Sequence, residues 1–357
     1  MGITIGNLIK GQEKHVLAYT KSGKVLLFSL SGNLLLDDIV AEKTAIWDGI
    51  IEDIDKDNEG EIILGGIDGL LRIFKCSEDF QLIPYWAHQF GASISGILIS
   101  DINNDGLNEI IAYSLDKSIR VLNPYSGALI WGQLFAEGVS DAIIFTNLDN
   151  VEKIEVIASS NDGTIRSFDS LKGDLLWFKQ FDNKVRTISY VRDEKDNFIV
   201  CGGDDKKLHI LEHERKEETK TLMMVDYVWK SVSYPYIFNN KLLVSTYSFD
   251  FLDENIPRQS IQFTSEVIAL DQKFNIMWKL KNVNVEKIDY IEVFGIKIVL
   301  VGSTKGELFL INELNGEILF QINHNSCIND FEFDKVSNIL ITCHDNGYIN
   351  AYRLSRD

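Results

Sequence analysis

The sequence predicts an all-β fold, a single β-propeller of four-stranded antiparallel blades, with eight blades preferred and seven as the alternative. A pattern of apolar runs and Gly-containing turns recurs about every 40–50 residues, a period typical of propellers and solenoids. Asp-Gly or Asn-Gly pairs stand between alternating runs at Asp68-Gly69, Asp162-Gly163 and Asn346-Gly347, and such pairs are the strongest short-range sign of a hairpin. Helical periodicity is nearly absent, and the 357 residues include only four prolines.

Each repeat contains a first apolar stretch, a second apolar run, a turn, an alternating strand and a last strand that often carries Trp. In the second repeat these are residues 49–54, the run from Glu61, residues 71–74 and Trp86. Four strands joined by short loops are the make-up of a propeller blade. The blades are expected near residues 1–40, 41–86, 87–134, 135–180, 181–222, 223–281, 282–323 and 324–357.

The two ends of the chain leave the blade count open. A first strand for blade 1 is expected near residues 3–8, whereas blade 8 has no clear fourth strand after residues 348–354. A sheet should not leave an exposed edge, so residues 3–8 are an alternative source of that strand. Blade 1 would then be short, and the count would be seven.

Composition narrows the classes of partner. The net charge is −18, from 35 basic and 53 acidic residues. This charge opposes binding to nucleic acid or to anionic membranes and favours a partner with a basic surface. No apolar run approaches the roughly 18 residues of a membrane span, so membrane insertion is not expected. The N-terminus lacks the pattern of a secretory signal, and the four scattered cysteines fit a reducing compartment, so we expect a cytoplasmic protein.

The second half of each repeat resembles the quinoprotein-like (PQQ-like, WD40-like) repeat, in which an apolar strand, Gly and a Trp-bearing strand follow one another. The best matches are Ile165–Asp169 with Gly173 and Trp177, Ile119–Asn123 with Gly127 and Trp131, and Val267–Asp271 with Trp278. The first half is similar to the FG-GAP repeat of integrin-α-like propellers, through its acidic turn. The resemblance implies eight blades. It also implies a scaffold, because intracellular propellers of this mixed type serve nutrient-signalling complexes and the BBSome coat.

Two acidic turns are candidate structural calcium sites. Oxygen side chains stand at relative positions 1, 3, 5 and 9 of both turns, and a tight loop of this kind can bring several oxygens to a hard cation. The turns contain Asp53, Asp55, Asp57 and Glu61, and Asp101, Asn103, Asp105 and Glu109. The resemblance to FG-GAP loops implies calcium, although those loops usually end in Asp. The alternative is a turn that is rich in Asp and Asn because these residues hydrogen-bond their own backbone.

An insertion at residues 248–265 of blade 6 is the first candidate for a partner-binding surface. Other blades have about two to four residues at this connection, and long loops cost little entropy to close. The insertion is rich in apolar side chains, namely Phe249, Phe251, Leu252, Ile256, Ile261 and Phe263. It either folds back on the propeller or offers a hydrophobic anchor to a partner.

The entries to the first strands of the blades are the second candidate, because they line the mouth of a propeller's central channel. They include Trp47, Arg186 and Trp229, and Trp and Arg dominate interface hot spots. The alternative is that such strand-end residues pair with one another inside the channel. No catalytic motif is present: the histidines fall singly apart from His209 and His213, which precede a charged stretch, residues 212–220, that we expect to be a solvated hairpin. We therefore expect a protein-interaction scaffold without a catalytic cofactor; the alternative is a small-ligand-binding or enzymatic propeller of quinoprotein type that uses the channel.

Overall fold

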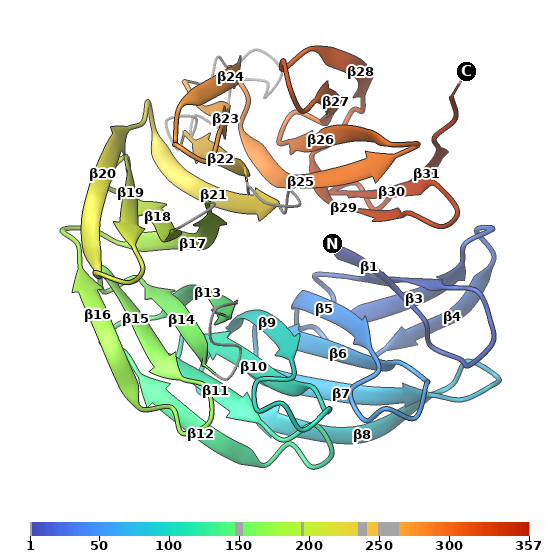
Figure 1. Ribbon diagram of the computed structural model, residues 1–357. Coiled ribbons are helices and arrows are strands. Elements are labelled where there is room, and N and C mark those ends of the chain that lie inside the picture. Colours follow the sequence, from blue (N-terminus) through green and yellow to red (C-terminus); the bar gives the residue numbers. More distant parts are fainter. Residues whose placement is uncertain (1, 147–152, 194–195, 235–240, 249–263, 357) are drawn as a thin grey trace. The chain divides into compact units, whose positions relative to one another are not determined.

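The structure is a computed structural model that describes residues 2–146, 153–193, 196–234, 241–248 and 264–356. These residues form only strands, turns and loops, and the strands form eight antiparallel sheets (Figure 1). Each sheet is one blade of a β-propeller; seven have four strands, and the last has three. The predicted all-β propeller is confirmed with eight blades, and the seven-blade alternative is wrong. None of the described residues forms a helix that is long and apolar enough to cross a membrane.

The chain divides into two compact units, Met1–Gln180 and Phe181–Asp357. Each unit contains four consecutive blades, and the strands of a blade follow one another in sequence order.

The first unit contains blades 1 to 4. Blade 1 is β1 (Gly2–Gly6), β2 (His15–Tyr19), β3 (Lys24–Ser29) and β4 (Leu34–Ile39). Blade 2 is β5 (Ile46–Glu52), β6 (Glu61–Gly66), β7 (Leu70–Cys76) and β8 (Leu82–Gln89). Blade 3 is β9 (Ile94–Ser100), β10 (Glu109–Ser114), β11 (Ser118–Leu122) and β12 (Leu129–Leu134). Blade 4 is β13 (Val139–Thr146), β14 (Ile154–Ser160), β15 (Thr164–Asp169) and β16 (Leu175–Gln180).

The second unit contains blades 5 to 8. Blade 5 is β17 (Val185–Arg192), β18 (Asn197–Gly203), β19 (Lys207–Glu212) and β20 (Glu217–Met223). Blade 6 is β21 (Tyr227–Tyr234), β22 (Lys241–Tyr247), β23 (Glu266–Leu270) and β24 (Ile276–Lys281). Blade 7 is β25 (Val285–Val293), β26 (Ile296–Ser303), β27 (Glu307–Asn312) and β28 (Ile318–Asn323). Blade 8 is β29 (Ile328–Asp334), β30 (Ile339–His344) and β31 (Ile349–Arg353).

The position of a strand in its blade explains its sequence pattern. The second strand is covered on both faces, and all six residues of Glu109–Ser114 are buried. Such a strand reads as a continuous apolar run rather than an alternation. The fourth strand lies at the outer edge, where five of the six residues of Ile318–Asn323 are exposed. The predicted Asp-Gly and Asn-Gly hairpins are confirmed, and Gly69, Gly163 and Gly347 each have a positive φ in their turns.

The first strand of the chain belongs to blade 1. Strand β1 pairs with β2 from Gly2 opposite Tyr19 to Gly6 opposite His15. The alternative that residues 3–8 complete blade 8 is therefore wrong. Blade 8 has three strands in the part of the chain that the structure describes.

A tryptophan contact joins neighbouring blades. The indole of Trp131 on β12 covers Gly173 in the next blade and donates a hydrogen bond of 2.7 Å to the carbonyl oxygen of Ser170. Trp278 on β24 covers Gly316 in the same way. The glycines have positive φ and lie in the turn before the fourth strand, so each turn presents bare backbone to an aromatic ring.

A second repeated contact is an ion pair between an aspartate in the turn before the third strand and the residue four positions later. Arg120 pairs with Asp116 at 3.0 Å, and its guanidinium lies 4.2 Å from the ring centroid of Phe90. In blade 5 the cation position is held by His209, whose Nε2 lies 2.7 Å from Asp205 Oδ2. His209 is buried, whereas residues 214, 215 and 217–219 of the charged hairpin that follows it are exposed, as predicted.

Candidate binding sites

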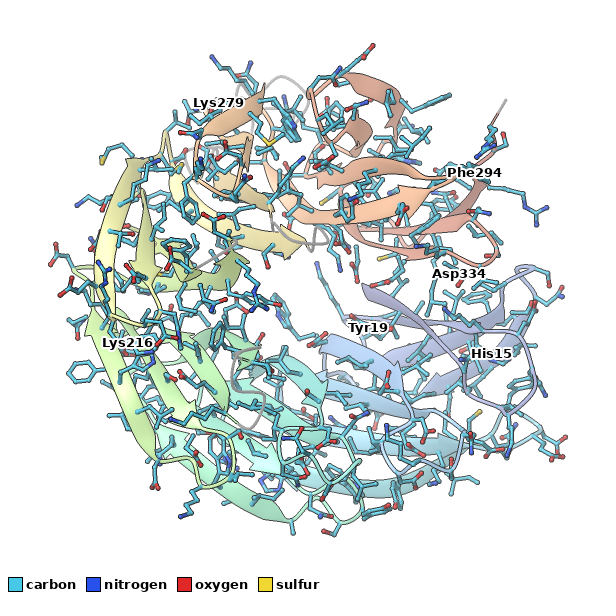
Figure 2. All side chains as sticks on the ribbon, in the orientation of Figure 1. His15, Tyr19, Lys216, Lys279, Phe294 and Asp334 are labelled. Carbon is cyan, nitrogen blue, oxygen red and sulfur yellow. The ribbon has the colours of Figure 1, made fainter. Side chains whose placement is uncertain are left out.

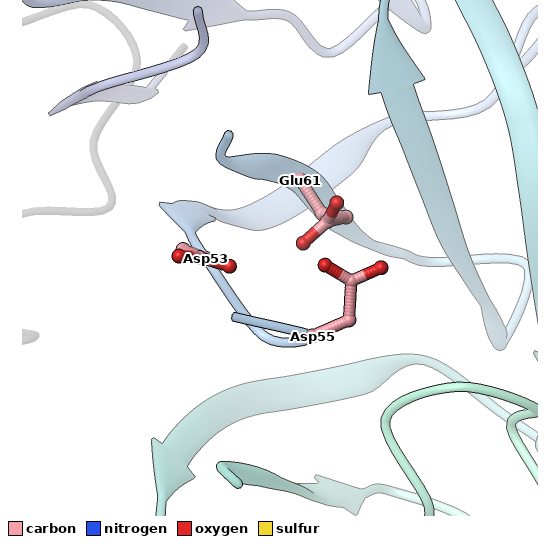
Figure 3. Close-up of side chains that lie close together, drawn as sticks. All are labelled: Asp53, Asp55 and Glu61. Carbon is pink, nitrogen blue, oxygen red and sulfur yellow. The ribbon is translucent and has the colours of Figure 1, made fainter. Parts of the chain in front are cut away.

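The acidic turn of blade 2 brings three predicted calcium ligands together between β5 and β6 (Figure 3). One carboxylate oxygen from each of Asp53, Asp55 and Glu61 lies within 4.8 Å of the others. Two backbone hydrogen bonds fold the turn: Asn58 N–H donates to Asp53 Oδ2 at 3.0 Å, and Ile54 N–H donates to Glu61 Oε2 at 3.1 Å. The sequence spacing therefore predicted a real cluster.

Lys75 on β7 reaches into this cluster. Its Nζ lies 2.7 Å from Asp55 Oδ2, 2.7 Å from Asp57 Oδ2 and 3.2 Å from Glu61 Oε1. Burial and the neighbouring Asp55 carboxylate raise the pKa of Glu61 to about 7, although the Ile54 N–H and Lys75 oppose the shift. Burial works against the charge of Lys75, but the three carboxylates outweigh it and raise the pKa of its ammonium group. The lysine thus supplies a positive charge where a bound cation would supply one.

The donor set of this turn suits a hard cation, but the lysine competes for it. Carboxylate oxygens are the ligands that calcium prefers. The Oδ1 atoms of Asp53 and Asp55 are buried and have no hydrogen-bond partner within the described residues. The Oδ2 atoms of Asp55 and Asp57 are already engaged by Lys75. Calcium binding here stays a prediction, and its outcome depends on Lys75.

The acidic turn of blade 3 is held by an amide instead. Asn103 Nδ2 donates to Asp105 Oδ2 at 3.0 Å and to Glu109 Oε1 at 2.7 Å. Asp101 Oδ2 accepts the Gly106 N–H at 2.9 Å. Lys75 follows Arg72 by three positions in blade 2, and Asn123 follows Arg120 by three positions in blade 3, so the equivalent place in blade 3 holds no lysine. The neutral amide keeps the turn closed, and no ion pair to its carboxylates is found among the described residues.

Two of the predicted channel-mouth residues contact each other. The guanidinium of Arg186 on β17 lies 5.2 Å from the ring centroid of Trp229 on β21, and its Nε donates to Asp204 Oδ1. The Trp229 ring in turn lies 4.9 Å from the ring of Tyr247. Trp47, on β5 of the first unit, is 60% exposed. Arg186 and Trp229 thus contact each other, as the alternative expects, and their part in partner binding stays a prediction.

The six apolar residues predicted on the blade 6 insertion lie outside the described residues, but the ends of the insertion are described. Asn284, buried at the start of blade 7, accepts the Ser248 N–H at 2.9 Å and donates to the Ser248 carbonyl oxygen at 3.0 Å. The hydroxyl of Ser265 donates to the same amide oxygen. One buried amide thus fixes both ends of residues 249–263.

The structure adds a charged cluster on the first strands of blades 7 and 8. Lys287 Nζ lies 2.9 Å from Asp330 Oδ1 and 3.9 Å from Glu332 Oε1. Burial raises the pKa of Glu332 to about 7; Lys287 opposes this shift, while Asp330 and Asp289 add to it. Burial and Asp330 also raise the pKa of Asp289, whereas the hydrogen bond from the Tyr290 N–H and the charge of Lys287 oppose this shift. The sequence analysis missed this cluster. Asp330 and Glu332 are two residues apart, a spacing that puts both on one face of a strand, and this spacing could have pointed to it.

The fold and these contacts define the class: the chain is a β-propeller. A family model for the lambda-carrageenase beta-propeller domain matches residues 124–247, and one for the KICSTOR complex protein kaptin matches residues 25–129. Each match covers less than half of the chain. A search of curated proteins finds no significant match.

Solved structures similar to this chain are propellers of distant sequence. Sqt1 of Chaetomium thermophilum, bound to the N-terminus of the ribosomal protein L10, has 12% identity and a TM-score of 0.75, with 99% of this chain and 96% of that chain covered. BamB of Moraxella catarrhalis has 14% identity and a TM-score of 0.66, with 98% and 96% covered. BBS1N in complex with ARL6DN has 13% identity and a TM-score of 0.61, with 86% and 91% covered. At these identities the likeness concerns the fold.

Proposed function

We propose that this protein is a non-catalytic scaffold for protein–protein interaction, a cytoplasmic subunit of a signalling or trafficking complex. One observation carries the proposal: Arg186 on the first strand of blade 5 is held by Asp204 and lies against Trp229 on the first strand of blade 6, so these groups engage one another. The four cysteines are buried and free, which suits a reducing compartment.

The comparisons support the same class of function. The kaptin family is named as part of the KICSTOR complex, and two similar structures are complexes with protein partners, L10 and ARL6DN. The net charge of −18 favours a partner with a basic surface and disfavours nucleic acid.

The test is affinity purification from cytosol of the tagged chain beside a variant in which residues 249–263 are replaced by a short Gly-Ser linker. Asn284 fixes both ends of the insertion, so the replacement leaves its attachment in place. We expect a stoichiometric partner with the intact chain. Its loss from the variant would assign the contact to Phe249, Phe251, Leu252, Ile256, Ile261 and Phe263; its retention would move the contact elsewhere. Recovery of no partner by either form would contradict the scaffold.

The second candidate is a small-ligand or enzymatic propeller of quinoprotein type. The cluster of Lys287, Asp289, Asp330 and Glu332 is the observation that favours it, because one carboxyl has a pKa of about 7. A turnover activity that is abolished by Asp330→Asn would establish this candidate and overturn the scaffold.

Structural calcium is a further part of the proposal. The oxygens of Asp53, Asp55 and Glu61 support it in blade 2, where Lys75 competes with the ion. In blade 3 the absence of an equivalent lysine supports it.

A further inference from the structure

One position of the fourth strand packs blade 3 against blade 4 and blade 6 against blade 7. It is the residue opposite the middle of the third strand: Trp131 lies opposite Val121, and Trp278 lies opposite Ala269. In blade 7 this position is Phe320, opposite Leu310. Trp131 and Trp278 are 6% and 7% exposed, whereas Phe320 is 66% exposed.

Phe320 lies on the face of blade 7 that packs against blade 8. Its neighbours on that face of the sheet, Leu308 and Ile322, pack in one cluster with Phe331 and Leu340 of blade 8. The tryptophans are covered by the turn before the fourth strand of the next blade, through Gly173 and Gly316. Blade 8 has no fourth strand among the described residues and hence no such turn. The exposure of Phe320 follows from this gap.

The outer edge of β31 is open within the described residues. His344 N–H donates to the Tyr348 carbonyl oxygen at 3.1 Å, and Leu354 N–H donates to the Asn338 carbonyl oxygen at 2.9 Å. Antiparallel pairing alternates along a strand, so the backbone groups of Ile349, Ala351 and Arg353 point away from β30. These three residues present a row of donors and acceptors on the side where every other blade has a fourth strand.

The residues after β31 follow another course. The guanidinium of Arg356 lies 5.4 Å from the ring centroid of Phe294, a residue of the turn between β25 and β26 that Figure 2 labels. Arg356 also donates to the Phe294 carbonyl oxygen at 3.3 Å. Residues 354–356 are thus held against blade 7 and supply no fourth strand.

We propose that β31 and Phe320 form a docking surface for an extended basic and apolar segment of a partner protein, which adds to blade 8 as its fourth strand. Strand addition draws affinity from backbone hydrogen bonds and specificity from side-chain pockets. The net charge of −18 favours a basic segment. This assignment deepens the scaffold function and rests on it.

A peptide copied from the chain itself is the probe. Residues 271–281 contain a turn and the fourth strand β24, and their three lysines outnumber one aspartate. We expect the labelled peptide to bind the purified chain in a fluorescence anisotropy titration. A peptide with Met277→Pro and Lys279→Pro should not bind, because proline cannot donate to a ladder. The acidic strand 312–323 should bind more weakly than the basic one.

Two variants of the chain locate the binding. Ala351→Pro removes an outward-pointing N–H without touching the ladder to β30, and Phe320→Ser removes the exposed ring. Each should weaken binding about tenfold or more. Leu134→Ser is the matched control, because Leu134 is 71% exposed on the fourth strand of blade 3, whose neighbour is complete. Hydrogen exchange should show the amides of Ile349, Ala351 and Arg353 fast in the free chain and slowed by the peptide.

Several results would overturn this assignment. The basic peptide would fail to bind, or it would bind the Ala351→Pro variant as tightly as the wild type. Alternatively, the three amides would exchange slowly in the free chain, or the acidic strand 312–323 would bind more tightly than the basic peptide. Self-association through this edge in sedimentation would replace the partner by a second copy. Because the titration uses purified components, its failure would reject this edge and leave the purification test of the scaffold standing.

Discussion

The indole N–H of Trp131 donates a hydrogen bond of 2.7 Å to the carbonyl oxygen of Ser170, one blade further along the chain. The ring also covers Gly173 so closely that a Cβ atom there would lie 2.6 Å from the indole. A single side chain therefore combines apolar burial, a buried hydrogen bond and a shape that only glycine accepts. The stability of the first unit should depend strongly on it.

We expect Trp131→Ala to lower the free energy of unfolding by about 3–5 kcal/mol, the usual cost of truncating a buried aromatic residue. Leu134→Ala, on the same strand but exposed, should change it by no more than about 0.5 kcal/mol. Urea unfolding followed by fluorescence or circular dichroism measures both. Equal effects of the two substitutions would show that the tryptophan contact is unimportant.

Gly173→Ala should also destabilise the protein, because it changes the residue against which the Trp131 ring packs. Gly173 has φ 73°, and Gly11 has φ 78° with nothing within 4 Å of its Cβ position. Both substitutions incur the left-handed backbone cost of about 1–2 kcal/mol. Only Gly173→Ala should add an overpacking cost, which is typically about 1–3 kcal/mol. The same urea titration compares them, and a Gly11→Ala variant as unstable as Gly173→Ala would remove the role of the ring.

The sequence predicted the components of this contact but not its partners. Trp131 and Gly127 stand in one repeat, and so do Trp177 and Gly173, but the sequence did not say which tryptophan meets which glycine. The structure pairs Trp131 with Gly173 of the next repeat, while the Trp177 indole donates to Glu155 of its own blade. Strand pairing follows from local turn chemistry, so the blades were predictable. The packing of one blade on another brings distant residues together, and no local pattern reports it.

Replacing Lys75 tests whether this lysine competes with calcium for the acidic turn of blade 2. Lys75→Met leaves Asp55, Asp57 and Glu61 without their cation. Breaking a buried ion pair costs about 3–5 kcal/mol, and because Lys75 and Asp57 are partly exposed we expect a loss at the low end of this range. Calcium should restore part of this loss, by about 2.7 kcal/mol when it reaches a hundred times its dissociation constant. Thermal unfolding with calcium or with a chelator measures the effect.

The wild-type chain should respond less to calcium in blade 2 than the Lys75→Met variant does. Lys172→Met, an exposed lysine of blade 4, is the control for the loss of one positive charge. A large calcium response of the wild type that survives in a chain with Asp101→Asn and Asp105→Asn would show that calcium displaces Lys75. The acidic spacing of this turn was visible in the sequence, whereas the approach of Lys75 depends on strand register and was missed.

The ion pair of His209 predicts a dependence on pH. Burial lowers the pKa of His209, but Asp205 and Glu218 outweigh it and raise the pKa above the ordinary value. The folded state therefore holds the proton more tightly than the unfolded state. This contribution to stability is complete below the ordinary histidine pKa of about 6.5 and is lost as the pH rises through the raised value.

His209→Arg is the matched variant, because arginine holds the equivalent position in blades 2, 3 and 4. Arginine keeps its charge, so the variant should lose less stability than the wild type between pH 6 and pH 9. Urea midpoints across this range measure the difference. Parallel pH profiles of the two proteins would show that His209 is not charged in the folded state.

Glu332 should have the opposite effect, because removing its charge should stabilise the folded protein at high pH. Its pKa is raised to about 7, first by burial and then by Asp330 and Asp289, so the folded state favours the protonated carboxyl. Its contribution is complete below the unfolded pKa near 4.5 and is lost as the pH rises through about 7. Glu332→Gln, which stays neutral, should raise the melting temperature at pH 8 and leave it nearly unchanged at pH 5. Glu317→Gln, at an exposed position just before β28, should have no such pH dependence. A Glu332→Gln variant that is less stable than the wild type at pH 8 would contradict this prediction. It would show that the attraction between Lys287 and the Glu332 carboxylate outweighs the cost of burying that charge beside Asp330 and Asp289.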